Sequence, residues 1–299
     1  MTRPWRIICG CLTAAVISAA LTGCQGQGPA PGPEPAPAEP AASVSAPPPA
    51  ADLILPEGMT VGARIMPPAG FERAKVLEGT FAAWLRQLPV KPHGSPVLHF
   101  DGTEKTAKVH AAVVAMDIGK RDLQQCADAA MRLRAEYLYQ ANQRDAITFR
   151  FTNGFEADYS RWRAGQRIKV QGNLTQWQGG TAPADDYGTF RKYLDMVFAY
   201  AGTLSLAAEL KPAALQDLEA GQVFIAGGSP GHCVIVMDVA VNGAGEKRFL
   251  LAQSYMPAQE IHLLKNPANP EGDPWYAPGD GEQLVTPQWT FSWDALRSW

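Results

Sequence analysis

The sequence predicts an α+β fold in which a helix packs on an antiparallel sheet. A long stretch of good helix formers, residues 122–142, comes first, and short apolar runs rich in Val and Ile follow it. Turns that contain Gly, Asn, Ser and Pro separate these runs, and such turns join antiparallel neighbours. A strand-rich half after a helical half favours α+β over an alternating α/β chain.

The helices are expected as follows. Residues 80–87 form a short amphipathic helix, and residues 187–210 are mainly helical, with an interruption near Gly202. The central helix is expected to have Asp122 as its N-cap and Gln125 at N3, in a capping-box-like pattern.

The strands are expected in the apolar runs that are rich in β-branched residues. These are residues 109–116, 147–151, 223–225, 232–241, 248–255 and 261–264. The last three form a meander, and the final forty residues, which are rich in Pro and Trp, are expected to wrap the surface.

The N-terminus has the features of an export signal. Arg3 and Arg6 precede a short apolar run, which is too short to span a bilayer comfortably, and Leu21-Thr22-Gly23-Cys24 follows at once. These last four residues resemble the lipobox of bacterial lipoproteins. The resemblance implies cleavage after residue 23 and lipid on Cys24, and Gln25 favours an outer membrane over an inner one.

Composition divides the rest of the chain into two parts. Residues 24–51 are almost all Ala, Pro, Gly, Ser and Glu, so we expect a disordered tether. In extended polyproline II geometry, at about 3.1 Å per residue, such a tether reaches roughly 80 Å. Residues 52–299 are expected to form one domain on the periplasmic side of the envelope. The net charge of −3 and the lack of Lys/Arg runs argue against a nucleic-acid partner.

Two cysteines remain once the signal is removed and Cys24 carries lipid. These are Cys126 and Cys233, and outside the cytoplasm a disulfide between them is one open alternative. The other is chemistry at Cys126. In the first turn of a helix, a thiol feels the positive end of the helix dipole, which is expected to lower its pKa.

His232 is the candidate base for that thiol. It opens a strand directly after a Gly-rich turn, where an imidazole can lie at the edge of a cleft. A third polar group must orient the ring, and Gln253 is the candidate. If Ala240 pairs with Lys247 across the turn, or Val239 with Glu246, Gln253 shares a sheet face with His232, and in the second register the two face each other directly. A register shifted by one residue would move Gln253 to the other face.

Several alternatives stay open at this stage. Glu260 or His262 could orient His232 in place of Gln253. Cys126, His232 and His262 together would suit zinc, although no close ligand pair is present and we expect neither metal nor cofactor. A Cys126–His232 dyad and a Cys126–Cys233 disulfide exclude each other, because neighbouring side chains of a strand point to opposite faces. If His232 faces Cys126, Cys233 faces away. Helical spacing also aligns Cys126 with core positions.

The arrangement resembles the NlpC/P60 and CHAP branches of papain-like peptidases. Gln125-Cys126 opens a helix, Gly231-His232 opens a strand, and the next strand ends in Gln253. The resemblance implies a papain-like half-barrel and hydrolysis of a peptide or amide bond of peptidoglycan. Cys126 would be the nucleophile, His232 the general base and Gln253 the orienting residue.

Residues 123–138 and 253–264 also resemble the family catalogued as domain of unknown function 4846, which brings no established activity. Five further side chains are candidates for substrate contacts, with an ion-paired helix face or a loop pinned to the core as the alternatives: Gln125, Arg132, Arg134, Trp275 and Tyr276. A lipid-anchored thiol hydrolase is the leading hypothesis, and a non-catalytic envelope-binding lipoprotein is the second. The sequence leaves the oligomeric state open.

Overall fold

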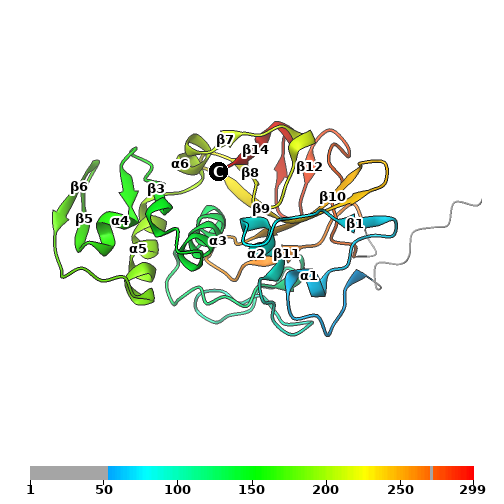
Figure 1. Cartoon of the computed structure of the whole chain (residues 1–299), viewed down its shortest axis with the longest axis horizontal. Coiled ribbons are helices and arrows are strands. Elements are labelled where there is room, and N and C mark those ends of the chain that lie inside the picture. Colours follow the sequence, from blue (N-terminus) through cyan, green and yellow to red (C-terminus); the bar gives the residue numbers. More distant parts are fainter. Residues whose placement is uncertain (1–52, 270–271) are drawn as a thin grey trace, which may run out of the picture. The chain divides into compact units, whose positions relative to one another are not determined.

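An antiparallel sheet forms the centre of the structure, and helix α3 packs across one of its faces (Figure 1). The computed structural model describes residues 53–269 and 272–299. The path through the sheet is β2-β11-β10-β9-β8-β14-β7, and β1 pairs with the outer half of β9. The strands are β1 (Phe71–Arg73), β2 (His110–Val113), β7 (Lys211–Pro212), β8 (Val223–Ala226), β9 (His232–Asn242), β10 (Lys247–Gln253), β11 (His262–Leu264) and β14 (Leu296–Ser298).

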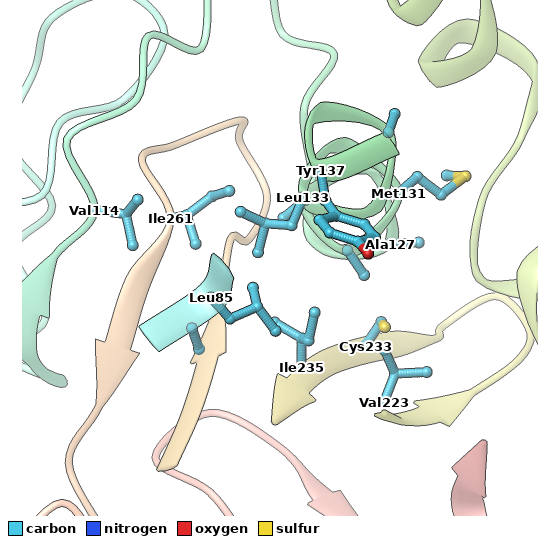
Figure 2. Close-up of a cluster of buried hydrophobic side chains, with 14 of the residues drawn as sticks. Leu85, Val114, Ala127, Met131, Leu133, Tyr137, Val223, Cys233, Ile235 and Ile261 are labelled. Carbon is cyan, nitrogen blue, oxygen red and sulfur yellow. The ribbon is translucent and has the colours of Figure 1, made fainter. Parts of the chain in front are cut away.

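Strand β9 is covered on both faces, which explains why its sequence is almost entirely apolar. Cys233 and Ile235 point to the core under α3, and Figure 2 shows them below Ala127 and Met131 of that helix. Val234, Val236 and Val239 point to a second core on the opposite face. Each aliphatic side chain buried there contributes about 1.5–3 kcal/mol, so β9 is tied firmly between two layers.

Helix α3 (Cys126–Gln140) begins three residues later than the sequence analysis placed it. Gln125 is the N-cap, and its backbone N–H donates to Asp128 Oδ2 at 3.0 Å, as the N3 acid of a capping box does. The expected N-cap, Asp122, instead accepts a hydrogen bond from the backbone N–H of Ala258, at 2.6 Å. Cys126 is therefore the first helical residue and not the fourth.

The remaining elements surround this centre. The expected helix over 80–87 is present, and the one over 187–210 is broken at Gly202 as predicted. The helices are α1 (Val61–Arg64), α2 (Phe81–Gln87), α4 (Tyr159–Arg163), α5 (Tyr187–Tyr200) and α6 (Thr203–Glu209), with 3-10 turns at Arg144–Ala146, Leu215–Asp217 and Trp293–Ala295. Three hairpins were not predicted: β3 (Thr148–Arg150) with β4 (Glu156–Asp158), β5 (Gln166–Gln171) with β6 (Leu174–Gly179), and β12 (Leu284–Val285) with β13 (Thr290–Phe291).

The α+β class is confirmed, and the role of the last residues is corrected. They do not merely wrap the surface, because β14 enters the sheet between β8 and β7. Its Leu296 is fully buried in the second core. Strand β14 is only three residues long, Leu-Arg-Ser, and so short a segment shows no alternation from which a strand could be predicted.

The features predicted for the N-terminus stay predictions. The signal over 1–23, the tether over 24–51 and the lipidated Cys24 lie outside the described residues. Within the described part of the chain, no helix has both the length and the apolar character needed to cross a bilayer.

Candidate active site at the start of helix α3

Cys126 lines a cavity of about 550 Å³ at the N-terminal end of α3. We name this cavity the Cys126 pocket; its walls include Cys126, Asp128, Thr203, Gly228, Gly231 and Met256. The Gly-rich turn before β9 closes one side of it. At Gly231 a Cβ atom would lie 2.4 Å from Thr203 Oγ1 and 2.6 Å from the carbonyl oxygen of Gly228, so only glycine fits.

The environment of Cys126 favours the neutral thiol. Burial and, to a smaller extent, the Asp128 carboxyl group raise the pKa of Cys126 to about 11, against the opposing effect of the backbone N–H groups of Ala127, Cys233 and Cys126 itself. The expectation of a lowered pKa is therefore wrong. The helix start does act on the sulfur, but desolvation outweighs it because the side chain is only 9% exposed.

Asp128 is a site residue that the sequence analysis missed. It is buried in the wall of the Cys126 pocket, and its Oδ1 atom has no hydrogen-bond partner among the described residues. Burial raises the pKa of Asp128 to about 8. The only sequence signal was an acid two residues after Cys126, at the N3 position of a capping box.

His232 and Gln253 are in contact, and a β-bulge makes this possible. At the turn, Lys247 pairs with Val241, one residue away from the register that we expected. Taken alone, that register would place Gln253 on the wrong face. The register shifts between Leu250 and Leu251, so that Ala252 pairs with Ile235, and Gln253 returns to the face of His232. His232 Nε2 then lies 2.8 Å from Gln253 Oε1.

The hydrogen-bond network around Gln253 defines the tautomer of His232. His262 Nδ1 lies 2.8 Å from the carbonyl oxygen of Glu260, so Nδ1 donates and Nε2 is left as an acceptor. The Gln253 amide N–H₂ donates to Gln288 Oε1 at 2.8 Å and approaches His262 Nε2 at 3.4 Å. Its Oε1 is therefore the acceptor, and His232 must donate from Nε2. The Nδ1 atom of His232 keeps its lone pair.

Burial keeps both histidines neutral. It lowers the pKa of His232 to about 4, against an opposing effect of the Gln253 hydrogen bond, and lowers that of His262 to about 3. Among the alternatives for the orienting group, Glu260 is engaged elsewhere, because its carboxylate pairs with Lys91 at 2.5 Å. His262 contacts the Gln253 amide and is not hydrogen-bonded to His232.

No hydrogen bond joins Cys126 to His232 in residues 53–269 and 272–299, and the alternation along β9 is the reverse of the one the dyad implied. Cys233 faces α3, whereas the His232 ring packs near Tyr255, Trp289 and Phe291, with ring centroids 5.0, 5.4 and 5.9 Å away. The backbone N–H of Cys233 acts on the Cys126 sulfur, so Cys126 lies near the start of β9. Both cysteines are free, so the structure contains no Cys126–Cys233 disulfide.

The proposed substrate contacts on α3 are partly corrected. Gln125 lines the Cys126 pocket, as a substrate contact would require. Arg132 is 1% exposed and is held by Glu136 at 2.7 Å, so it is not available to a ligand. Arg134 lies over the rings of Phe81, Tyr137 and Trp299 and does not line the Cys126 pocket.

Trp275 and Tyr276 are also buried, so stacking on a sugar is excluded for them. Trp275 Nε1 donates to the carbonyl oxygen of Met66 at 2.7 Å, and the Tyr276 hydroxyl donates to that of Lys265 at 2.6 Å. These aromatic residues pin a loop to the core, which was the alternative interpretation.

The described residues do not provide a ligand set for zinc. In the described part of the chain, no three His, Cys, Asp or Glu side chains are grouped so that they could hold a metal ion. Cys126, His232 and His262 therefore do not form a metal centre.

The fold and the site define an α+β protein with a buried thiol at a helix start and an oriented histidine on the adjacent strand. The family described as domain of unknown function (4846) matches residues 61–298, and the chain belongs to this family. No curated protein and no solved structure matches the chain.

The buried histidines predict that stability falls in acid. An unfolded histidine binds a proton near pH 6.5, whereas His262 in the folded state does not until about pH 3. The free energy of unfolding should therefore fall as the pH is lowered from about 6.5 towards 3. Urea unfolding at several pH values should show a shallower fall for His262→Gln than for the native chain. The matched control is His93→Gln, at an exposed position, and an equal slope in both variants would contradict the prediction.

The charge of Asp128 is expected to lower the reactivity of the Cys126 thiol, because it raises the pKa of that thiol. Removal of its charge should lower the pKa of Cys126, so Asp128→Asn should react faster with iodoacetamide between pH 8 and about 10. Asn can still accept from the Gln125 N–H, so the helix start is preserved. Alkylation rates followed by mass spectrometry test this, with the exposed Asp217→Asn as control. Equal rates in the two variants would show that Asp128 does not act on the sulfur.

Proposed function

We propose that this chain is a papain-like thiol hydrolase of the cell envelope that cleaves a peptide or amide bond of peptidoglycan or a similar substrate. The observation that carries the proposal is the orientation of His232. Gln253 holds Nε2 as a donor, which leaves the Nδ1 lone pair to accept a proton. Papain-like hydrolysis requires an imidazole in which one ring nitrogen donates to a side-chain amide and the other accepts the proton of the thiol.

Cys126 supplies the nucleophile in this proposal. At neutral pH its thiol and the His232 imidazole are both uncharged, because burial raises one pKa and lowers the other. The thiol proton would pass to His232 Nδ1 as the sulfur attacks; this requires the start of β9 to shift so that the ring, with its Gln253 hydrogen bond kept, comes within reach of the sulfur. Catalytic hydrogen bonds of free enzymes are often long and form only with substrate bound. The resulting tetrahedral oxyanion would face the N–H groups at the start of α3.

The Cys126 pocket supports a substrate of moderate size. Its volume of about 550 Å³ lies within the usual range of ligand sites, roughly 300–1,000 Å³. Asp128 and Gln125 present polar atoms to it, and Met256 presents an apolar surface. Such a mixture suits a peptide better than a purely apolar ligand.

The second candidate is a non-catalytic envelope-binding protein. The observation that favours it is the lack of a Cys126–His232 hydrogen bond among the described residues, together with the raised pKa of the thiol. In this case the Cys126 pocket binds its ligand without cleaving it. The two functions differ in one observable: only hydrolysis releases new amino and carboxyl groups from the substrate.

The hydrolase proposal predicts the release of new amino groups from purified peptidoglycan, measured with fluorodinitrobenzene. Cys126→Ala should abolish release, and His232→Ala should lower the rate by about 10²–10⁴-fold. Cys233→Ala is the matched control, because it removes a buried thiol that has no role in the mechanism. If the native chain releases nothing, and it and Cys126→Ala bind peptidoglycan equally, the binding function replaces the hydrolase. Equal release by both would remove Cys126 as the nucleophile.

We also propose that lipid on Cys24 anchors the chain to the outer membrane. Support comes from the basic n-region, the short apolar run and the lipobox-like Leu21–Cys24 sequence. In detergent phase separation, the native chain should enter the detergent phase, and Cys24→Ala should not. Cys233→Ala again serves as the control. Equal partitioning of the native chain and Cys24→Ala would refute the lipid anchor.

A further inference from the structure

A second cavity, also of about 550 Å³, lies beside strand β2 and shares no lining residue with the Cys126 pocket. We name it the β2-edge pocket. Its walls combine basic side chains with prolines and aliphatic groups: Arg64, His93, Lys108, His110 and Lys265, with Ile54, Pro92, Pro96 and Val113. No acidic residue of the described part of the chain lines it.

The positive charges of this pocket are not all available. The Arg64 guanidinium donates to the carbonyl oxygens of Gly58 at 2.8 Å and Lys91 at 3.2 Å, and the charge of Glu57 acts on it. Lys108 and Lys265 differ from it: within residues 53–269 and 272–299, neither ammonium group forms a hydrogen bond or an ion pair. Among the residues that the structure describes, these two lysines therefore carry the positive charge of the pocket that no ion pair offsets.

The backbone holds the two lysines close together. Leu264 of β11 pairs with His110 of β2, and the N–H of Lys265 donates to the carbonyl oxygen of Val109 at 2.9 Å. Lys265 thus lies beside the segment that carries Lys108. Like charges held together without a counter-charge repel each other, and an anion between them removes that repulsion.

His110 gives independent support for a ligand. Its Nε2 atom donates to the carbonyl oxygen of Ser95 at 3.2 Å, while Nδ1 is buried without a partner among the described residues. Burial lowers the pKa of His110, and the charges of Lys265, Lys108 and Lys105 lower it further. A bound anion would offset these charges and thereby favour the protonated form of the ring.

We propose that the β2-edge pocket binds a small organic anion whose phosphate or carboxylate group lies between Lys108 and Lys265. The apolar part of the ligand packs against Pro92, Pro96 and Val113. The cavity has the volume of a small-molecule site and is larger than a single inorganic ion requires. This site is independent of catalysis at Cys126.

Calorimetric titration of the full-length chain tests the proposal, with inorganic phosphate and succinate as separate probes at constant ionic strength. Saturable binding of at least one probe is expected, and the probe that binds identifies the anionic group. The double substitution Lys108→Gln with Lys265→Gln should weaken binding by about tenfold or more. The control carries the same charge change at two exposed lysines, Lys169→Gln with Lys192→Gln, and should bind like the native chain.

The outcomes separate clearly. Binding that both double variants retain would place the anion elsewhere and overturn the proposal, as would the lack of saturable binding of either probe to the native chain. Equal melting temperatures of the two variants without ligand show that a loss of affinity does not come from unfolding. His110 adds a spectroscopic readout: its ¹⁵N signal should move towards the protonated form when the probe binds.

Discussion

The pairing of β9 with β10 determines most of what the site can do. β9 is buried on both faces, so each of its side chains is committed to one of two cores. A one-residue shift in register would exchange those faces. The bulge between Leu250 and Leu251 makes such a shift part-way along the pair, and it brings Gln253 to His232. The orientation of the imidazole therefore depends on the sheet and not on the local sequence.

The buried carboxylate of Asp238 helps to hold this arrangement. It is fully buried on β9 and pairs with Arg86 at 2.7 Å and with Arg73 of β1. Loss of either arginine would leave part of a buried charge uncompensated, which is far more costly than the loss of a surface ion pair. Strands β1 and β9 and helix α2 are thus linked by one carboxylate in the sheet that also positions His232.

The two pockets beside the sheet offer different chemistry. At the start of α3, burial keeps a thiol, a carboxyl group and an imidazole close to their neutral forms, and this suits proton transfer within a closed site. At the β2 edge, lysines that pair with no acidic side chain of the described residues suit the binding of an anion. In both places, desolvation shifts the pKa values more than any single neighbouring charge does.

The sequence by itself determined the α+β class, the main helices and the β9–β11 meander, because periodicity and turn residues act locally. It offered Gln253 as one candidate partner of His232, but the bulge between β9 and β10 is what brings the two side chains together. It misjudged the start of α3, since Asp122 is a preferred N-cap residue and Gln125 is not, and it left open whether Arg132 and Trp275 contact substrate or are held by an ion pair and by the core. Only the tertiary structure decided the facing of Cys233, the entry of β14 into the sheet and the direction of the pKa shift at Cys126. These depend on contacts between distant segments, and desolvation is a property of the packed interior that no local pattern encodes.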